Sequence, residues 1–208
     1  MQTDPTTNSK IASAARLLLL VSAAWLAGCS TMQATDTGFL KNRNEMALSP
    51  DGSRAQYRSD KPVNPHQVRS LAVEWALPND VGLSSTDKAL LMTSLKLAIS
   101  RETEALPTNI GGRPIAIRAV ITRIDSVSAF LNTVSSLVLT VPVDRGGAAV
   151  EIEVLDADTG ELLASIAHAK FSSLSAFRAR FSTFAAAQLA LDAAAIELAK
   201  LLTTKSSG

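Results

Sequence analysis

Alternating apolar and polar residues mark several stretches of the chain as strands. In the first stretch the larger apolar side chains fall on one side, at Leu71, Val73 and Trp75. Successive side chains of a strand point to opposite faces of a sheet, so a period of two predicts strands with one buried face. The pattern recurs and predicts four strands, at residues 69–75, 115–124, 150–154 and 161–169.

Two other stretches show the spacing of helices. Ser84 and Asp87 match a capping box at the start of the first helix, which we expect to end near Leu106, before Pro107. Its apolar residues recur every three or four positions, at Leu91, Leu95, Ala98 and Ile99. We expect a second, long helix from Ser173 onward, with apolar residues at Leu174, Phe177, Phe181, Phe184, Leu191, Ala195, Leu198 and Leu202.

The order of these elements predicts the fold class. Residues 156–160, with Asp156, Asp158 and Gly160, have the composition of a hairpin turn between the last two strands. The order is therefore β-α-β-β-β-α, and we expect one α+β domain at residues 66–205. Its sheet is mixed or mostly antiparallel, with about four strands and two helices packed on one face. Residues 125–145 fit a strand, a helix or a loop.

An apolar run near the start of the chain ends at its single cysteine. Lys10 and Arg16 precede residues 17–27, a run with the length of a signal-peptide core and too short to span a bilayer as a helix. We therefore predict a signal peptide at residues 1–28. Its last residues, Leu26, Ala27 and Gly28, followed by Cys29, resemble the lipobox of bacterial lipoproteins.

This resemblance implies a lipid anchor. In bacterial lipoproteins the cysteine is acylated, and the chain is cut in front of it, so Cys29 becomes the first residue. Two or more acyl chains hold a protein stably on a membrane, whereas a single chain holds it only marginally. Ser30, which is not acidic, implies transfer to the outer membrane, with the domain facing the periplasm. The alternative is an ordinary secretory signal that leaves Cys29 as a free thiol.

Polar residues and turn signals dominate the next segment. Residues 29–65 contain apolar residues singly and are interrupted by Pro and Gly, so we expect a flexible tether that partly covers the domain. Without residues 1–28, which hold Lys10, Arg16 and Asp4, the chain has as many acidic as basic side chains. This balance gives no indication of nucleic-acid binding.

Several short motifs resemble a known family. They are Gly38-Phe39-Leu40, the stretch Leu131-Asn132-Thr133-Val134, and two stretches around the predicted hairpin, at residues 151–156 and 158–163. Together with the lipobox, these motifs resemble the bacterial lipoproteins of the domain of unknown function 3313. The family has no established activity, so the resemblance implies no catalytic residue.

The residues that usually carry chemistry are sparse. His66 and His168 have no cysteine or acid at the spacing of metal ligands, so we predict neither a metal nor a cofactor. No serine of the chain lies in a Gly-x-Ser-x-Gly motif, and this disfavours a hydrolase. Glu151 and Glu153 point the same way from one strand, and we interpret them as its solvated face rather than as catalytic carboxylates.

These observations lead to two hypotheses. The first is a non-enzymatic outer-membrane lipoprotein that serves as an accessory or interaction module, with the membrane and an envelope protein as its partners. The second is a carrier of a lipid or small apolar ligand, bound between the sheet and the C-terminal helix. Residues near this interface form a candidate groove for a ligand or a partner, at Asn132, Thr133, Phe177, Phe181 and Phe184.

Overall fold

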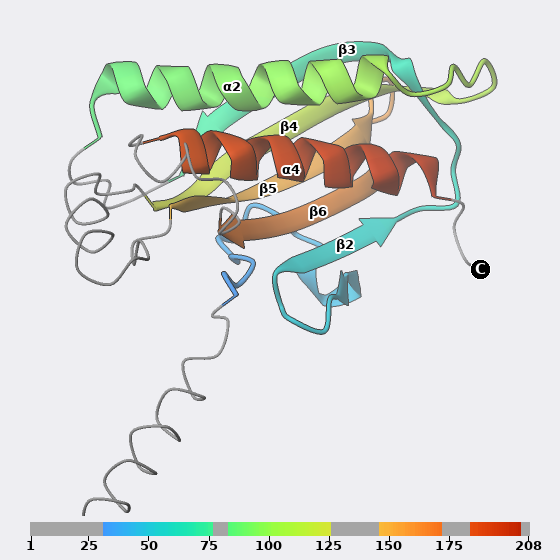
Figure 1. Ribbon diagram of the computed structural model, residues 1–208. Coiled ribbons are helices and arrows are strands. Elements are labelled where there is room, and N and C mark those ends of the chain that lie inside the picture. Colours follow the sequence, from blue (N-terminus) through green and yellow to red (C-terminus); the bar gives the residue numbers. More distant parts are fainter. Residues whose placement is uncertain (1–30, 77–82, 126–145, 172–183, 205–208) are drawn as a thin grey trace, which may run out of the picture. The chain divides into compact units, whose positions relative to one another are not determined.

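A six-stranded sheet and two α-helices dominate the part of the chain that the computed structural model describes, residues 31–76, 83–125, 146–171 and 184–204 (Figure 1). The chain divides into two units, residues 1–30 and residues 31–208, and every described residue belongs to the second. No described helix has the length and apolar character needed to cross a membrane.

The sheet is mixed. Its strands are β1 (Ala47–Leu48), β2 (Arg54–Arg58), β3 (Val63–Trp75), β4 (Arg113–Asp125), β5 (Gly147–Asp156) and β6 (Leu162–Phe171). They lie in the order β1-β2-β6-β5-β4-β3, with β3 and β4 parallel and every other pair antiparallel. The helix α2 (Ser85–Glu104) connects the parallel pair, as the geometry of parallel strands requires a long crossover. The helix α4 (Ala185–Thr203) follows β6.

The predicted α+β class and mixed sheet are confirmed, but the predicted number and order of strands are not. The four predicted strands form β3 to β6, each somewhat longer than its alternating pattern. β1 and β2 precede them, so the sheet has six strands and the order begins with two strands that we did not predict. β1 has only two residues, both exposed, and β2 is mostly polar with only Ala55 buried, which leaves no apolar period to detect.

The segment expected to be a flexible tether that partly covers the domain contains secondary structure of its own where the structure describes it. Residues 31–65 contain β1, β2, the first residues of β3 and the short 3-10 helix η1 (Arg43–Glu45). β2 pairs with β6 along its whole length, from Arg54 opposite His168 to Arg58 opposite Ala164. Backbone hydrogen bonds to β6 order a polar strand that could not be ordered by burial alone.

Local sequence signals set the ends of α2. Ser84 caps the helix: its side chain accepts a hydrogen bond from Asp87 N (3.1 Å), and Asp87 Oδ2 accepts one from Ser84 N (3.3 Å). This is the predicted capping box, which satisfies backbone donors that have no partner within the helix. The helix ends at Glu104, two residues before the expected end.

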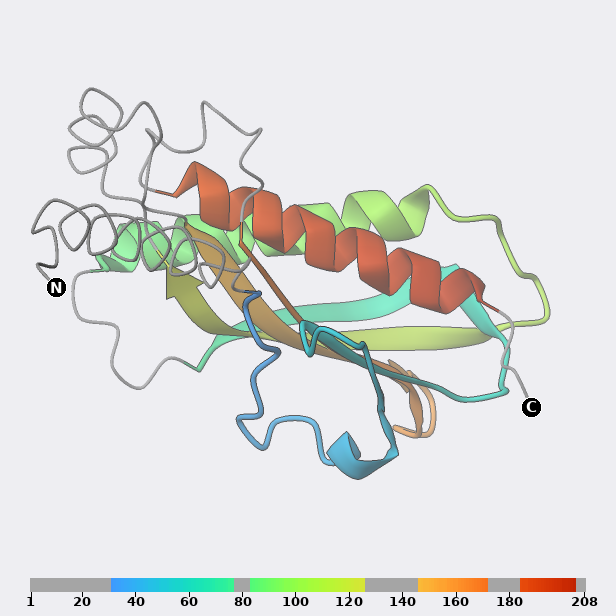
Figure 2. The ribbon, with the colours of Figure 1, turned by 60° about the horizontal axis from the view of Figure 1, so that its bottom comes forward.

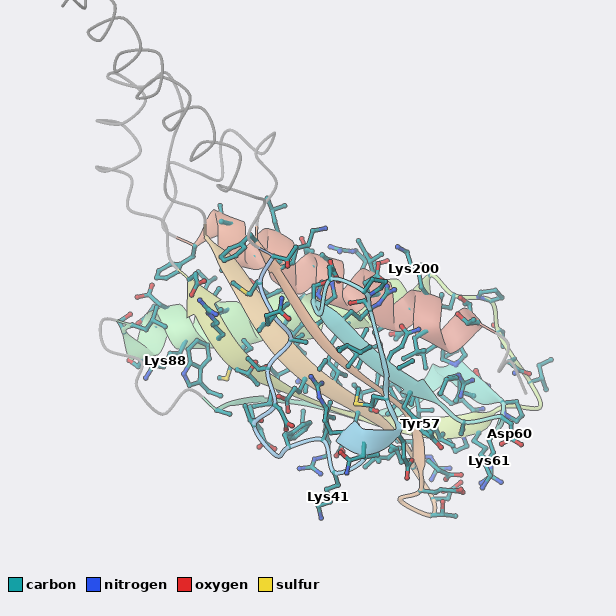
Figure 3. All side chains as sticks on the ribbon, turned by 90° about the horizontal axis from the view of Figure 1, so that it is seen from below. Lys41, Tyr57, Asp60, Lys61, Lys88 and Lys200 are labelled. Carbon is teal, nitrogen blue, oxygen red and sulfur yellow. The ribbon has the colours of Figure 1, made fainter. Side chains whose placement is uncertain are left out.

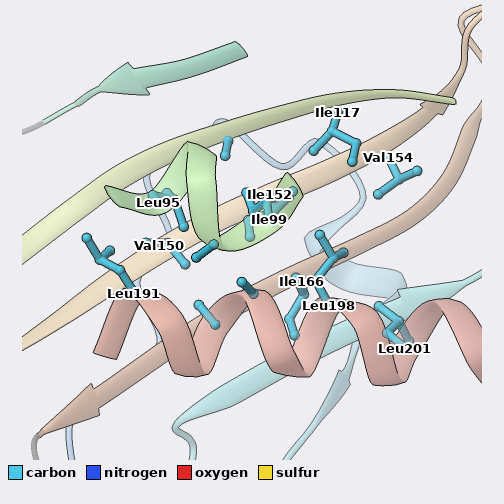
Figure 4. Close-up of a cluster of buried hydrophobic side chains, with 14 of the residues drawn as sticks. Leu95, Ile99, Ile117, Val150, Ile152, Val154, Ile166, Leu191, Leu198 and Leu201 are labelled. Atoms are coloured by element: carbon cyan, nitrogen blue, oxygen red, sulfur yellow. The ribbon is translucent and has the colours of Figure 1, made fainter. Parts of the chain in front are cut away.

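Both helices pack on the same face of the sheet. The core between them is formed by fully buried side chains of α2, α4 and the central strands, such as Leu95, Ile99, Ile152, Ile166 and Leu198 (Figure 4). Small residues of α4, including Ala187, Ala194 and Ala195, are at most 1% exposed and allow the helix to lie close to the strands. The predicted two-helix layer is therefore present.

The predicted hairpin joins β5 and β6. Asp156 is the side chain that holds it, because Asp156 Oδ1 accepts hydrogen bonds from Asp158 N (2.9 Å) and Thr159 N (3.1 Å). Gly160 has a φ of +73°, a conformation that favours glycine. Hydrogen bonds from Arg113, and then from the turn, lower the pKa of Asp156 to about 2.

Two predictions fall largely outside the described residues. Of residues 125–145, the structure describes only Asp125, the last residue of β4. The long C-terminal helix is described from Ala185, and the first part of its predicted range, residues 173–183, lies outside the described chain.

Candidate functional site

The N-terminal part of the described chain covers part of the face of the sheet opposite the helices. Residues 31–46, which we call the N-terminal segment, cross this face from one end of β5 toward its middle (Figure 2). Met32 and Leu40 are 2% and 3% exposed, and they pack against small side chains of β5 and β6. These are Ala149 and Ala169 under Met32, and Ala167 under Leu40.

Hydrogen bonds fix the N-terminal segment from its first residues. Thr31 Oγ1 and Gln33 Nε2 donate to Asp51 O at 3.3 Å and 3.0 Å, and Ala34 N donates to Gly52 O at 2.9 Å. A further bond joins Thr35 Oγ1 to the hydroxyl of Thr122 on β4 (2.6 Å). The chain is therefore held to the body from Thr31, the second residue after Cys29, first through the turn between β1 and β2.

Glu151 is the main polar contact beneath this segment. It is 1% exposed, and its two carboxylate oxygens accept hydrogen bonds from Thr37 N (3.0 Å) and Thr37 Oγ1 (2.9 Å). Interpreting Glu151 as part of a solvated strand face was therefore wrong, because the N-terminal segment covers it. Glu153, two residues further along β5, pairs instead with Arg118 Nη1 (2.7 Å). The two carboxylates do point the same way, but each has its own partner.

A shallow hollow of about 610 Å³ lies beside these residues. Phe39 and Arg118 form part of its wall, with the Arg118 guanidinium carbon 5.2 Å from the centre of the Phe39 ring. Lys41, also in its lining, points away from the sheet (Figure 3). Arg118 is paired with Glu153, and Lys41 and Glu45 also line the hollow, so the hollow carries charges of both signs.

His168 does not form a catalytic arrangement with the described residues. It is 8% exposed, and this burial lowers the pKa of its imidazole to about 4. No described serine or acid shares a hydrogen bond with it, so a Ser-His-acid arrangement is absent from the described chain. Within the same residues, no cluster of three His, Cys, Asp or Glu side chains could hold a metal ion.

Most of the predicted site residues lie outside the described chain. This holds for Cys29 and the preceding Leu26, Ala27 and Gly28, and for the groove residues Asn132, Thr133, Phe177 and Phe181. Phe184 is described: it precedes α4, is partly buried and packs against the main core. Phe184 thus contributes to the core. Its helical spacing was compatible with either a core residue or a groove residue.

The interface between α4 and the sheet is filled by side chains over the described residues. The residues of α4 that face the sheet are at most 2% exposed: Ala187, Ala190, Leu191, Ala194 and Leu198. This is where the second hypothesis puts an apolar ligand. The described residues therefore give that hypothesis no support.

Among the described strands, β3 forms one edge of the sheet. β3 pairs only with β4, so the backbone groups on its other side have no partner strand within the sheet. The opposite edge is formed by β1, which has only two residues. A hollow of about 330 Å³ lies between β3 and α2, with Val68, Leu71 and Lys96 in its lining. The described edge most able to accept a partner strand is therefore β3.

The expectation that residues 29–65 partly cover the domain agrees with the position of the N-terminal segment, but its contacts could not be predicted, because most of its residues are polar and suggest a linker. The motif Gly38-Phe39-Leu40 was the available signal. Gly38 has a φ of +80°, Phe39 contacts Arg118, and Leu40 is buried. The buried state of Glu151 had no such signal, since its partner Thr37 is more than a hundred residues away in the chain.

Comparisons with known proteins gave matches to solved structures and to one family. The solved structures include the PelC dodecamer from Paraburkholderia phytofirmans, with 11% identity, a TM-score of 0.40, and coverage of 74% of this chain and 100% of that one. A DUF330 protein from Xanthomonas campestris has 14% identity, a TM-score of 0.35, and coverage of 69% and 89%.

No curated protein matches the chain. The family described as "Protein of unknown function (DUF3313)" matches residues 35–198. The match extends from the N-terminal segment into α4 and so includes the six described strands, α2 and most of α4. The chain therefore belongs to the DUF3313 family.

Proposed function

We propose that the protein is a lipoprotein of the bacterial outer membrane, anchored through acyl chains on Cys29. In this proposal the α+β body faces the periplasm and acts as a non-enzymatic accessory or interaction module for another envelope protein. Family membership leaves the molecular role open, because the family itself has no known function.

The observation that carries the proposal is the position of the only cysteine. It follows an apolar run and the small residues Ala27 and Gly28, and it lies two residues before the first described contact of the body, at Thr31. A cysteine at this boundary has no second cysteine with which to form a disulfide inside the chain. Acylation there would attach the body to a membrane directly.

Labelling with palmitate tests the anchor. Label should enter the wild-type protein, and its mature N-terminus should be Cys29. The Cys29→Ser variant should take up no label and should leave the membrane fraction or remain unprocessed. Ser30→Ala is the matched control and should behave as the wild type. Label in Cys29→Ser, or a wild-type N-terminus at another residue, would refute the proposal.

The destination of the lipoprotein has its own test. A non-acidic residue after the cysteine resembles the pattern of lipoproteins that travel to the outer membrane. Ser30→Asp should therefore keep the palmitate label but move the protein from the outer-membrane to the inner-membrane fraction. An unchanged distribution would argue against sorting by this residue.

The open edge of β3 supports a role in binding a partner. An added strand would satisfy the unpaired backbone groups of β3 with main-chain hydrogen bonds. A photocrosslinking residue at the exposed Ser70 of β3 should capture a defined envelope protein in intact cells. The same residue at Glu45, which is exposed in η1 on another part of the body, is the matched control. Equal capture from both positions would argue against β3 as the partner surface.

A further inference from the structure

The described chain begins close to one end of the sheet and far from the other. We call the end where Asp125, Gly147 and Phe171 lie the entry end, because Met32 packs there. The far end is where β5 turns into β6 through residues 157–161. Along the ten residues of β5, the two ends are roughly 30 Å apart at about 3.3 Å per residue.

Met32 is locked onto the entry end. Its side chain is 2% exposed, and its Cε lies 2.9 Å from the place where a Cβ on Gly147 would sit. Phe171, the last residue of β6, packs against the same cluster. The N-terminal segment then runs away from this end, since Thr37 reaches Glu151 and Leu40 reaches Ala167.

The link from the anchor to this fixed point is too short to act as a tether. Only three residue steps separate Cys29 from Met32, so their Cα atoms lie at most about 11 Å apart even in an extended chain. We infer that the entry end of the body is its membrane-facing end, held against the periplasmic leaflet by this short link, while the far end points into the periplasm. This inference rests on the proposed acylation of Cys29.

The orientation can be measured with a single added cysteine. Acylation leaves Cys29 without a free thiol, so a second cysteine takes up a fluorophore alone. Lys170→Cys, exposed near the entry end, and Thr159→Cys, exposed in the hairpin turn, provide the two positions. Along β6 they lie roughly 25 Å or more apart. Each acylated, full-length mature protein would be placed in vesicles of phosphatidylethanolamine and phosphatidylglycerol that contain lipids with a spin label on the headgroup.

Quenching of the fluorophore by these lipids reports its distance from the surface. We expect quenching at Lys170→Cys to be several-fold stronger than at Thr159→Cys. Equal quenching at both positions, in protein that floats with the vesicles, overturns the orientation but leaves the lipid anchor standing. Stronger quenching at Thr159→Cys also overturns it and points to the far end, where Ile110 is 93% exposed. Failure to float, together with absence of palmitate, overturns both proposals.

A spacer tests whether the short link is the cause. A Gly/Ser insertion of about 20 residues between Ser30 and Thr31 gives a flexible tether with a mean span of roughly 25 Å, similar to the length of the body. Quenching at Lys170→Cys should then fall toward the value at Thr159→Cys, while palmitate labelling stays unchanged. Undiminished quenching would show that the link does not orient the body and would refute this mechanism.

Discussion

The contact between Thr37 and Glu151 gives the sharpest test of the structure. Thr37→Val removes the hydroxyl with little change in shape and leaves a buried carboxylate oxygen of Glu151 without its donor. A hydrogen bond to a charged group contributes about 1.5–3 kcal/mol. We therefore expect the free energy of unfolding to fall by about 2 kcal/mol.

The measurement is urea unfolding at neutral pH, with the mature chain carrying Cys29→Ser so that it stays in solution. Trp75, the only tryptophan after the predicted signal peptide, provides the fluorescence signal. With a slope of about 2 kcal/mol/M, a loss of about 2 kcal/mol lowers the unfolding midpoint by about 1 M. Thr93→Val makes the same chemical change at an exposed position of α2 and should alter stability by less than about 0.5 kcal/mol.

A double-mutant cycle separates the contact from other effects of the substitution. Glu151→Gln removes the charge but keeps the shape, so Thr37→Val should cost less in that background than in the wild type. We expect a coupling energy of about 1 kcal/mol or more, as for residues in direct contact. Loss of less than 0.5 kcal/mol in Thr37→Val, or a coupling near zero, would show that the N-terminal segment is not held on the sheet through Glu151.

Two further predictions concern the same body. Gly147→Ala should lower the free energy of unfolding by about 1–3 kcal/mol in the same urea assay, because the added Cβ would lie 2.4 Å from Lys170 O and 2.9 Å from Met32 Cε. Gly111→Ala is the control, because a Cβ there meets nothing within 4 Å. Equal stability of the two variants would contradict the packing around Gly147. His168 should destabilise the protein in mild acid. Burial lowers the pKa of its imidazole in the folded state from 6.5 to about 4, so the unfolded state binds the proton at a higher pH than the folded state does. The free energy of unfolding should therefore fall by up to about 3 kcal/mol as the pH drops from about 6.5 to about 4. His168→Gln should remove this part of the pH dependence, and an unchanged pH profile would refute it.

Local patterns were sufficient to predict the central part of the fold. The alternation in β3 to β6, the capping box of Ser84 and Asp87, and the turn at residues 156–160 depend on residues within a few positions of one another. Propensity, capping and turn chemistry act over the same short distances. The α+β class follows from the order of such elements, and so the sequence predicted it.

The candidate site was only partly accessible from the sequence. The lipobox at Cys29 is a local motif, so the lipid anchor could be predicted from it, although these residues lie outside the described chain. The groove proposed around Phe177 and Phe184 rested on helical spacing, which does not distinguish a groove from a core. The structure places Phe184 against the core.

The sequence by itself determined the class of fold, the hairpin, the first helix and the sequence pattern of the anchor. Each of these depends on residues that are close together in the chain. Tertiary structure decided that residues 31–65 belong to the body. Met32 and Leu40 lie in a mostly polar stretch without an apolar period, and they are buried because small alanines of β5 and β6 lie beneath them. Glu151 became an interior group because a segment more than a hundred residues earlier brings Thr37 over it. Such contacts depend on residues distant in the chain, and a local pattern of apolar and polar residues does not predict them.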